Sequence, residues 1–274
     1  MSDAQVKALR EALPNTEVWC SPGDESTGGT WRYDEDYYDN SEHGETTIKR
    51  LPNTDQVKLR YNESHGEALT IQEIYQKVNP STVTVLTGNR DGSAMVGTGV
   101  IFTEDGYILT NAHVIAGGSE CYVVLDTGED YRACLLGLDE EKDLAVIKIA
   151  ASGLPAAEFG DSDALTVGDP VYAIGNPLGL GLAISSGIIG STAHELDRYA
   201  LPCIVNSADI SRGSSGGALM NAHGQVIGVT SGAYTYGNNM YLAVPVDPVM
   251  AADLTVSGWT LKEVKAIEAA KDKD

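Results

Sequence analysis

Short apolar runs separated by Gly, Asp, Asn and Glu residues fill the middle of the chain. A first series occupies residues 83–86, 96–102, 107–109, 121–125, 131–136 and 144–149, and a second occupies residues 171–174, 183–189, 203–205, 218–220, 226–230 and 240–244. Runs this short, with no long helical pattern between them, are typical of all-β sandwiches and barrels. Because the two series are of similar size, we predict two β-barrels packed together.

The two ends of the chain follow other patterns. Thr70 and Glu73 form a capping box, which predicts a short helix through Ile74 and Val78 that ends near Pro80. A second capping box, over residues 260–263, predicts a helix near the C-terminus. We therefore expect an acidic extension over residues 1–66, barrel one over about 67–155, barrel two over about 156–250, and a helical tail over 251–274.

Charge and hydropathy narrow the range of functions. The 274 residues hold 39 acidic and 18 basic side chains, a formal charge of −21, which repels nucleic-acid backbones and attracts basic partners. Solubility alone would also account for it. No apolar run approaches the roughly 18 residues that cross a bilayer, so no membrane span is expected. The N-terminus shows no signal peptide, and a removed targeting segment is one interpretation of its Met-Ser-Asp start.

Four cysteines raise the question of disulfides. Cys121 and Cys134 flank a hairpin-turn composition at residues 126–129, which places them nearly opposite each other and predicts a disulfide. The alternative is two buried thiols. Cys20 and Cys203 are a second candidate pair. No cysteine pair has the spacing of zinc ligands, and the acidic residues 34–39 lack the pattern of a calcium loop, so we expect no metal site.

Three segments carry candidate chemistry. His113 follows one apolar run, Asp143 precedes another, and Ser215 lies in the glycine-flanked run Gly-Ser-Ser-Gly-Gly. A serine hydroxyl becomes a strong nucleophile when a histidine takes its proton, and a carboxylate orients that histidine. Glycines beside Ser215 allow the backbone N–H groups of Gly213 and Ser215 to converge on an oxyanion. Each segment alone has an ordinary structural explanation, but their combination predicts nucleophilic catalysis.

The run around Ser215 also fits the nucleophile elbow of the α/β-hydrolases. That fold requires a helix after the elbow and the order Ser, Asp, His. Here a strand and a turn follow, and His223, which comes after Ser215, lies in that turn. The elbow interpretation is therefore rejected.

From about residue 69 to 250, the chain resembles the trypsin-like serine peptidases of the HtrA/Deg branch. The resemblance rests on motifs in matching order, at residues 97–101, 110–114, 143–149, 173–179 and 213–217. It implies two perpendicular antiparallel β-barrels with a site between them, in which His113 is the general base, Asp143 its orienter and Ser215 the nucleophile. It implies protein or peptide substrates and no cofactor. No PDZ domain is expected after the barrels, and a secreted or cell-surface peptidase is the favoured setting.

Asp209 departs from that branch. It lies six positions before Ser215, where trypsin-like enzymes carry the aspartate of the S1 pocket, so we expect a preference for Arg or Lys at P1. The alternative is that Asp209 points elsewhere, toward Arg212 or Arg198. The other residues expected to line this pocket are Ile210, Thr230, Ser231 and Gly232.

The sequence thus predicts a serine endopeptidase that acts through an acyl-enzyme on Ser215. The alternative is a latched or non-enzymatic peptide-binding module on a peptidase scaffold.

Overall fold

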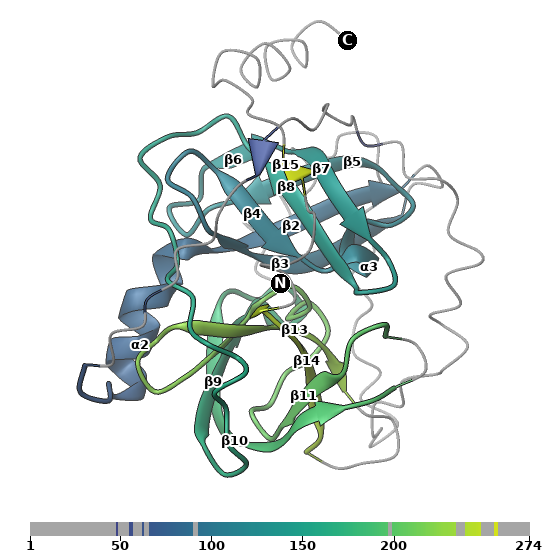
Figure 1. Ribbon diagram of the computed structural model, residues 1–274. Coiled ribbons are helices and arrows are strands. Elements are labelled where there is room, and N and C mark those ends of the chain that lie inside the picture. The colour runs from purple at the N-terminus through teal and green to yellow at the C-terminus, as the bar shows by residue number, and fades with distance from the viewer. Residues whose placement is uncertain are drawn as a thin grey trace, which may run out of the picture.

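The fold consists of two β units, one above the other in Figure 1. The computed structural model describes residues 48, 55–56, 62, 66–89, 93–196, 199–233, 239–247 and 255–256. In these residues the strands follow the two predicted series, and helices are short. The prediction of an all-β protein with two barrel-like units is confirmed.

The first unit is a seven-stranded antiparallel sheet in the order β6-β5-β2-β3-β4-β8-β7. Its strands are β2 (Thr82–Asn89), β3 (Ala94–Ile101), β4 (Tyr107–Thr110), β5 (Gly118–Val124), β6 (Asp130–Arg132), β7 (Cys134–Asp139) and β8 (Leu144–Lys148). The edge strands β6 and β7 are separated by Ala133 alone, so the chain that was expected to form one strand bends there and connects the two edges of the sheet.

The second unit is a closed six-stranded barrel in the order β10-β11-β14-β13-β12-β9. Its strands are β9 (Pro170–Gly175), β10 (Ala183–His194), β11 (Cys203–Asn206), β12 (Ala218–Met220), β13 (Val226–Ala233) and β14 (Tyr241–Pro245). Strand β10 continues five residues beyond the predicted end at Ile189, with register shifts against β11. A short 3-10 turn, η3 (Pro177–Gly179), follows β9.

Both faces of the sheet in the first unit carry apolar side chains, and the two faces belong to different clusters. In β4, Ile108 belongs to the core inside that unit, whereas its neighbour Leu109 belongs to a cluster shared with the second unit. Side chains on successive strand residues point to opposite faces, which explains the split. Because Ile174 and Val229 of the second barrel join Leu109 in the shared cluster, burial of this cluster holds the two units together.

The predicted helix is confirmed as α2 (Ile71–Val78), and 3-10 turn η2 (Asn79–Ser81) follows it. Both hydrogen bonds of the capping box are present, since the Glu73 amide donates to Thr70 Oγ1 at 3.3 Å and the Thr70 amide donates to Glu73 Oε2 at 2.8 Å. Ile74 and Val78 are buried against the cluster shared by the two units.

Little of the two terminal segments is described, and the second capping box lies outside the described residues. Where they are described, they contact both units and each other. The Gln225 side-chain amide, beside β13, donates to the Asn62 carbonyl at 2.7 Å. Ile48 is buried in the core of the first unit, and its amide donates to the Gly118 carbonyl at 3.2 Å. The two-residue strands β1 (Asp55–Gln56) and β15 (Thr255–Val256) pair antiparallel, which the sequence did not suggest.

The predicted disulfide between Cys121 and Cys134 is wrong, because both residues are buried thiols. The hairpin register pairs Tyr122 with Arg132, and the Ala133 amide donates to the Cys121 carbonyl at 2.8 Å. Cys121 therefore faces Ala133 rather than Cys134. Cys134 is one residue further along the chain than Ala133, so its side chain points to the opposite face of the sheet. Cys121 therefore lies inside the first unit, and Cys134 lies in the cluster shared with the second unit. Cys203 is also a buried thiol, and Cys20 lies outside the described residues.

Candidate active site

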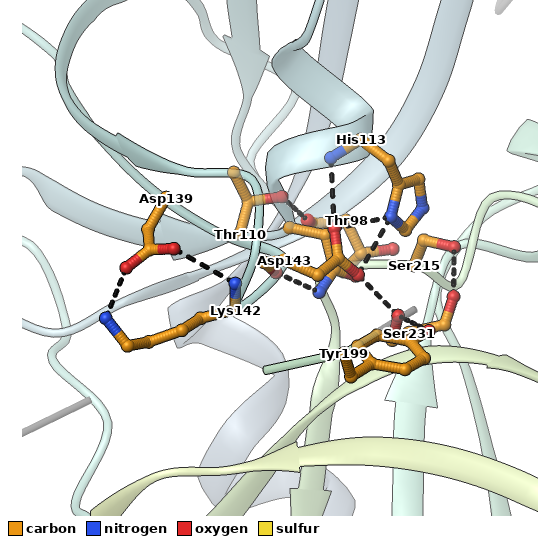
Figure 2. A network of polar contacts seen from close by, with 10 residues as sticks. Thr98, Thr110, His113, Asp139, Lys142, Asp143, Tyr199, Ser215 and Ser231 are labelled. Carbon is orange, nitrogen blue, oxygen red and sulfur yellow. Dashed lines mark hydrogen bonds and ion pairs between the residues drawn. The ribbon is translucent and has the colours of Figure 1, made fainter. Parts of the chain in front are cut away.

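Three candidate catalytic residues, His113, Asp143 and Ser215, here called the triad, lie together where the two units meet (Figure 2). His113 is in α3 (Ala112–Ile115), which is separated from β4 by Asn111 alone, and Asp143 directly precedes β8. Both therefore come from the first unit. Ser215 lies on the turn that leads into β12 of the second unit.

The His113 ring is oriented by the Asp143 carboxylate. Nδ1 of His113 lies 2.8 Å from Oδ1 and 3.0 Å from Oδ2 of Asp143, and the His113 backbone amide donates to Oδ1 at 3.1 Å. An ionised carboxylate can accept hydrogen bonds but not donate them, so the neutral imidazole carries its proton on Nδ1. The Nε2 lone pair is thereby left to accept a proton.

A tight turn holds Asp143 in an uncommon backbone conformation. The Lys142 amide donates to Asp139 Oδ1 at 3.0 Å, and Asp143 then has a φ of 54°, in the left-handed region. The side-chain amide of Asn111 donates to the Asp143 carbonyl at 2.9 Å. These contacts compensate a conformation that costs an ordinary residue about 1–2 kcal/mol.

The second unit also holds this carboxylate. Ser231 Oγ, on β13, donates to Asp143 Oδ2 at 2.5 Å, and the hydroxyl of Tyr199 lies 2.7 Å from Ser231 Oγ. The Ser231 carbonyl accepts from Ser215 Oγ at 3.0 Å. Ser231 therefore contacts both the orienting carboxylate and the candidate nucleophile (Figure 2).

The turn that carries Ser215 is braced by β3 of the first unit. The Thr98 amide donates to the Ser215 carbonyl at 2.7 Å, and Thr98 Oγ1 donates to the Gly213 carbonyl at 2.7 Å. Thr110 Oγ1 in turn donates to the Thr98 carbonyl at 2.7 Å. A Cβ at Gly216 would lie 2.0 Å from the Thr98 carbonyl oxygen, so this close approach of the two units requires glycine.

Gly213 adopts a φ of +93°, and its surroundings orient its amide. The carbonyl of Arg212 accepts from the Leu178 amide at 2.6 Å. In a trans peptide the C=O and the next N–H point in opposite directions, so the Gly213 N–H points away from Leu178. Throughout the described part of the chain, neither the Gly213 amide nor the Ser215 amide donates to a protein acceptor. Both are available to a ligand.

Four of the five predicted pocket residues, all except Asp209, have contacts that differ from one another. Thr230 is buried, and its Oγ1 donates to the Ser214 carbonyl at 2.6 Å, so its side chain braces the Ser215 turn. Ser231 hydrogen bonds to Asp143, as described above. Ile210 packs against the core of the second barrel, and Gly232 lies on β13 opposite Leu242 of β14.

Asp209 is exposed, and its carboxylate is paired with the phenol of Tyr241 on β14. Burial, together with the hydrogen bond to Asp209, raises the pKa of Tyr241 to about 12. The Asp209 carbonyl accepts from Ser185 Oγ at 2.6 Å, which fixes the backbone of this segment. Tyr241 was not recognised in the sequence, because it lies more than thirty positions away from its partner.

Residues that support the triad were also missed. Thr98 and Thr110 lie within motifs that the sequence analysis had noted, whereas nothing in the sequence distinguished Tyr199. Among the described residues, no three His, Cys, Asp or Glu side chains converge as metal ligands. The helices of that same part are all too short or too polar to cross a membrane.

Comparison with known proteins finds similarity to serine peptidases. The family model of the trypsin-like peptidase domain matches residues 97–229. A probable periplasmic serine endoprotease, DegP-like, of Halomonas elongata is 41% identical over 167 residues, which cover 60% of this chain and 35% of the relative. A protein of the same description from Chlamydia trachomatis is 43% identical over 155 residues, covering 55% of this chain and 31% of the relative. This chain thus spans about a third of the length of these relatives.

Solved structures of similar fold are also proteases. The HtrA-type protease AlgW with a tripeptide aligns with a TM-score of 0.63 at 32% identity, over 67% of this chain and 62% of that chain. A serine endoprotease from Yersinia pestis aligns with a TM-score of 0.59 at 31% identity, over 68% of this chain and 66% of that chain.

Proposed function

Because the chain belongs to the trypsin-like peptidases of the HtrA/Deg branch, we propose that it is a serine endopeptidase that forms an acyl-enzyme on Ser215. The observation that carries the proposal is the His113–Asp143 contact of 2.8 Å beside Ser215. Acyl transfer requires a nucleophile, a base and a group that orients the base, and the Ser215 hydroxyl, the His113 imidazole and the Asp143 carboxylate can fill these roles.

The proposed reaction begins with a rotation of the Ser215 hydroxyl. Its proton now points to the Ser231 carbonyl, and turning about the Cα–Cβ bond directs it toward His113. His113 Nε2 takes this proton as Oγ bonds to the substrate carbonyl carbon, and Asp143 stabilises the imidazolium that results. The same proton then passes to the leaving amine, which departs, and water hydrolyses the ester by the reverse sequence.

The amides of Gly213 and Ser215 are the proposed oxyanion donors. Both N–H groups are available, and the Arg212 peptide is held by Leu178 in the orientation that directs the Gly213 N–H away from η3. Backbone donors fixed before the reaction stabilise developing negative charge without reorganisation. These contacts favour a competent site over the latched alternative.

A preference for Arg or Lys at P1 is the proposed specificity. The Tyr241 phenol supplies one hydrogen bond to Asp209, and a carboxylate has further lone pairs that can accept from a guanidinium or ammonium group. The formal charge of −21 would also attract basic peptides. Ile210 and Gly232 are proposed as wall residues of this pocket.

The proposed substrates are proteins or peptides, and the proposed location is outside the cytoplasm. Support comes from the relatives, which are described as probable periplasmic serine endoproteases, and from the similar HtrA-type protease AlgW, which is described with a tripeptide.

A peptide library derived from a proteome tests the proposal. The wild type and Ser215→Ala are each incubated with the library, and new termini are identified by mass spectrometry. Cuts made by the wild type and absent with Ser215→Ala are the expected result. Identical digests from the two proteins would refute the endopeptidase.

The residue at P1 in the same data tests the specificity. Arg and Lys are expected at P1 for the wild type, and Asp209→Asn should reduce those cuts while keeping the shape of the side chain. Cuts after Val, Ala or Leu in the wild type would overturn the role of Asp209 and leave the endopeptidase intact.

A further inference from the structure

The Asp143 carboxylate depends on a hydrogen-bond chain that continues beyond Ser231. Its Oδ1 accepts from the His113 amide, and its Oδ2 accepts from Ser231 Oγ at 2.5 Å. A serine hydroxyl has one proton, and this proton is used on the carboxylate. Ser231 Oγ must therefore be the acceptor of its 2.7 Å contact with Tyr199, whose phenol is the donor.

The direction of these bonds gives the phenol a specific effect. Donation from Tyr199 to Ser231 Oγ polarises the Ser231 O–H toward Asp143, because consecutive hydrogen bonds strengthen one another. It also selects one of the three staggered positions of the Ser231 hydroxyl. Ser231 is 4% exposed, so water cannot readily supply the same hydrogen bond.

The segment that carries Tyr199 is fixed against the turn that carries Asp143. The Ala200 amide donates to the Glu141 carbonyl at 2.7 Å, and the Tyr199 amide donates to the Leu196 carbonyl at 3.0 Å. The Tyr199 ring packs against the cluster shared by the two units. Tyr199 and Asp143 are thus held on either side of Ser231 by contacts outside the triad.

We propose that Tyr199 is a positioning residue of the catalytic site, which acts on Asp143 through the Ser231 hydroxyl. This inference rests on the proposed endopeptidase function. It adds a fifth side chain to the network of Ser215, His113, Asp143 and Ser231, and this side chain joins the network through its hydrogen bond to Ser231.

Kinetics of Tyr199→Phe test this role. Removing the phenolic oxygen should lower kcat by about 3- to 10-fold, as expected for one neutral hydrogen bond, with KM unchanged. Tyr172→Phe is the matched control, because Tyr172 packs against the same cluster and its hydroxyl is outside this network. In a Ser231→Ala background, Tyr199→Phe should have no further effect, since the bridging hydroxyl is gone. Equal rates for the two Tyr→Phe variants, or full additivity with Ser231→Ala, would overturn the proposal.

A second measurement does not depend on turnover. In a Ser215→Ala background, the proton between His113 Nδ1 and Asp143 is followed by its downfield NMR resonance. Tyr199→Phe should shift this resonance and speed its exchange with water, whereas Tyr172→Phe should not. An unchanged resonance would overturn the proposal even if the chain proved not to be a peptidase, so the two failures are distinguishable.

Discussion

Replacing Gly213 by alanine should abolish most catalysis while leaving the fold intact. A Cβ at this position would lie 2.4 Å from the Asn176 carbonyl oxygen and 3.1 Å from the Leu178 nitrogen, both of them backbone atoms. Rotation of a side chain cannot relieve these contacts, so the Arg212–Gly213 peptide must turn. The Gly213 N–H then leaves its place in the proposed oxyanion site. Loss of one such donor lowers kcat by about 100- to 1,000-fold.

Gly128→Ala separates this effect from simple backbone strain. Gly128 has a φ of +86°, close to the +93° of Gly213, and no atom lies within 4 Å of a Cβ built there. Both variants should lose about 1–2 kcal/mol of stability, because an alanine in the left-handed region is strained. Gly213→Ala should lose roughly 1 kcal/mol more, because turning its peptide breaks the hydrogen bond between the Leu178 amide and the Arg212 carbonyl. Gly128→Ala should nevertheless keep its activity.

Hydrolysis of a peptide identified from the library gives kcat and KM for both variants, and urea unfolding gives their free energies of unfolding. A Gly213→Ala enzyme whose kcat stays within about threefold of Gly128→Ala would refute the assigned oxyanion donor. A large loss of stability in Gly213→Ala alone would show that the clash is relieved by unfolding of the turn rather than by its rotation.

Two further predictions concern stability and thiol chemistry. Thr70→Ala removes the acceptor of the Glu73 amide at the start of α2, and urea unfolding should show a loss of about 1 kcal/mol. Burial raises the pKa of Cys121 to about 12 from its ordinary 9.0, so iodoacetamide at pH 9 should modify this thiol in the unfolded chain and spare it in the native one. The Cys121 thiol ionises at a lower pH in the unfolded chain than in the native one, so the free energy of unfolding should fall as the pH rises from 9.0 to about 12. In Cys121→Ala, the free energy of unfolding should fall less steeply over the same pH range. A native protein whose melting temperature drops with reductant would contradict the two-thiol arrangement of Cys121 and Cys134.

The parts of the molecule that the sequence predicted are those fixed by local rules. The capping box of α2 uses residues three positions apart, and the strands follow from alternation that is visible within each run. His113, Asp143 and Ser215, which the structure brings together, could be selected as candidates because acyl transfer needs these side chains and because glycines surround the serine. Their residue types carry the signal before any fold is known.

The parts that the sequence could not predict depend on register and on distant partners. Whether Cys121 faces Cys134 or Ala133 is decided by one residue at the hairpin turn, and composition does not specify that offset. Tyr199 and Ser231 are 32 positions apart, and they meet because separate parts of the second barrel come together there. A contact of this kind has no periodicity that a single sequence could reveal.

Hydrogen bonds run in both directions between the two units, which explains why the site can be stable at their boundary. The first unit supplies Thr98, which fixes the Ser215 turn of the second, and the second supplies Ser231, which fixes Asp143 of the first. Neither half of the triad is therefore held by its own unit alone. The apolar cluster that contains Leu109 and Val229 holds the two units in their relative positions. A cavity in this cluster would therefore disturb the hydrogen bonds of Thr98 and those of Ser231 together. The geometry of the site is thus a property of the interface, to which residues far from the reacting atoms contribute.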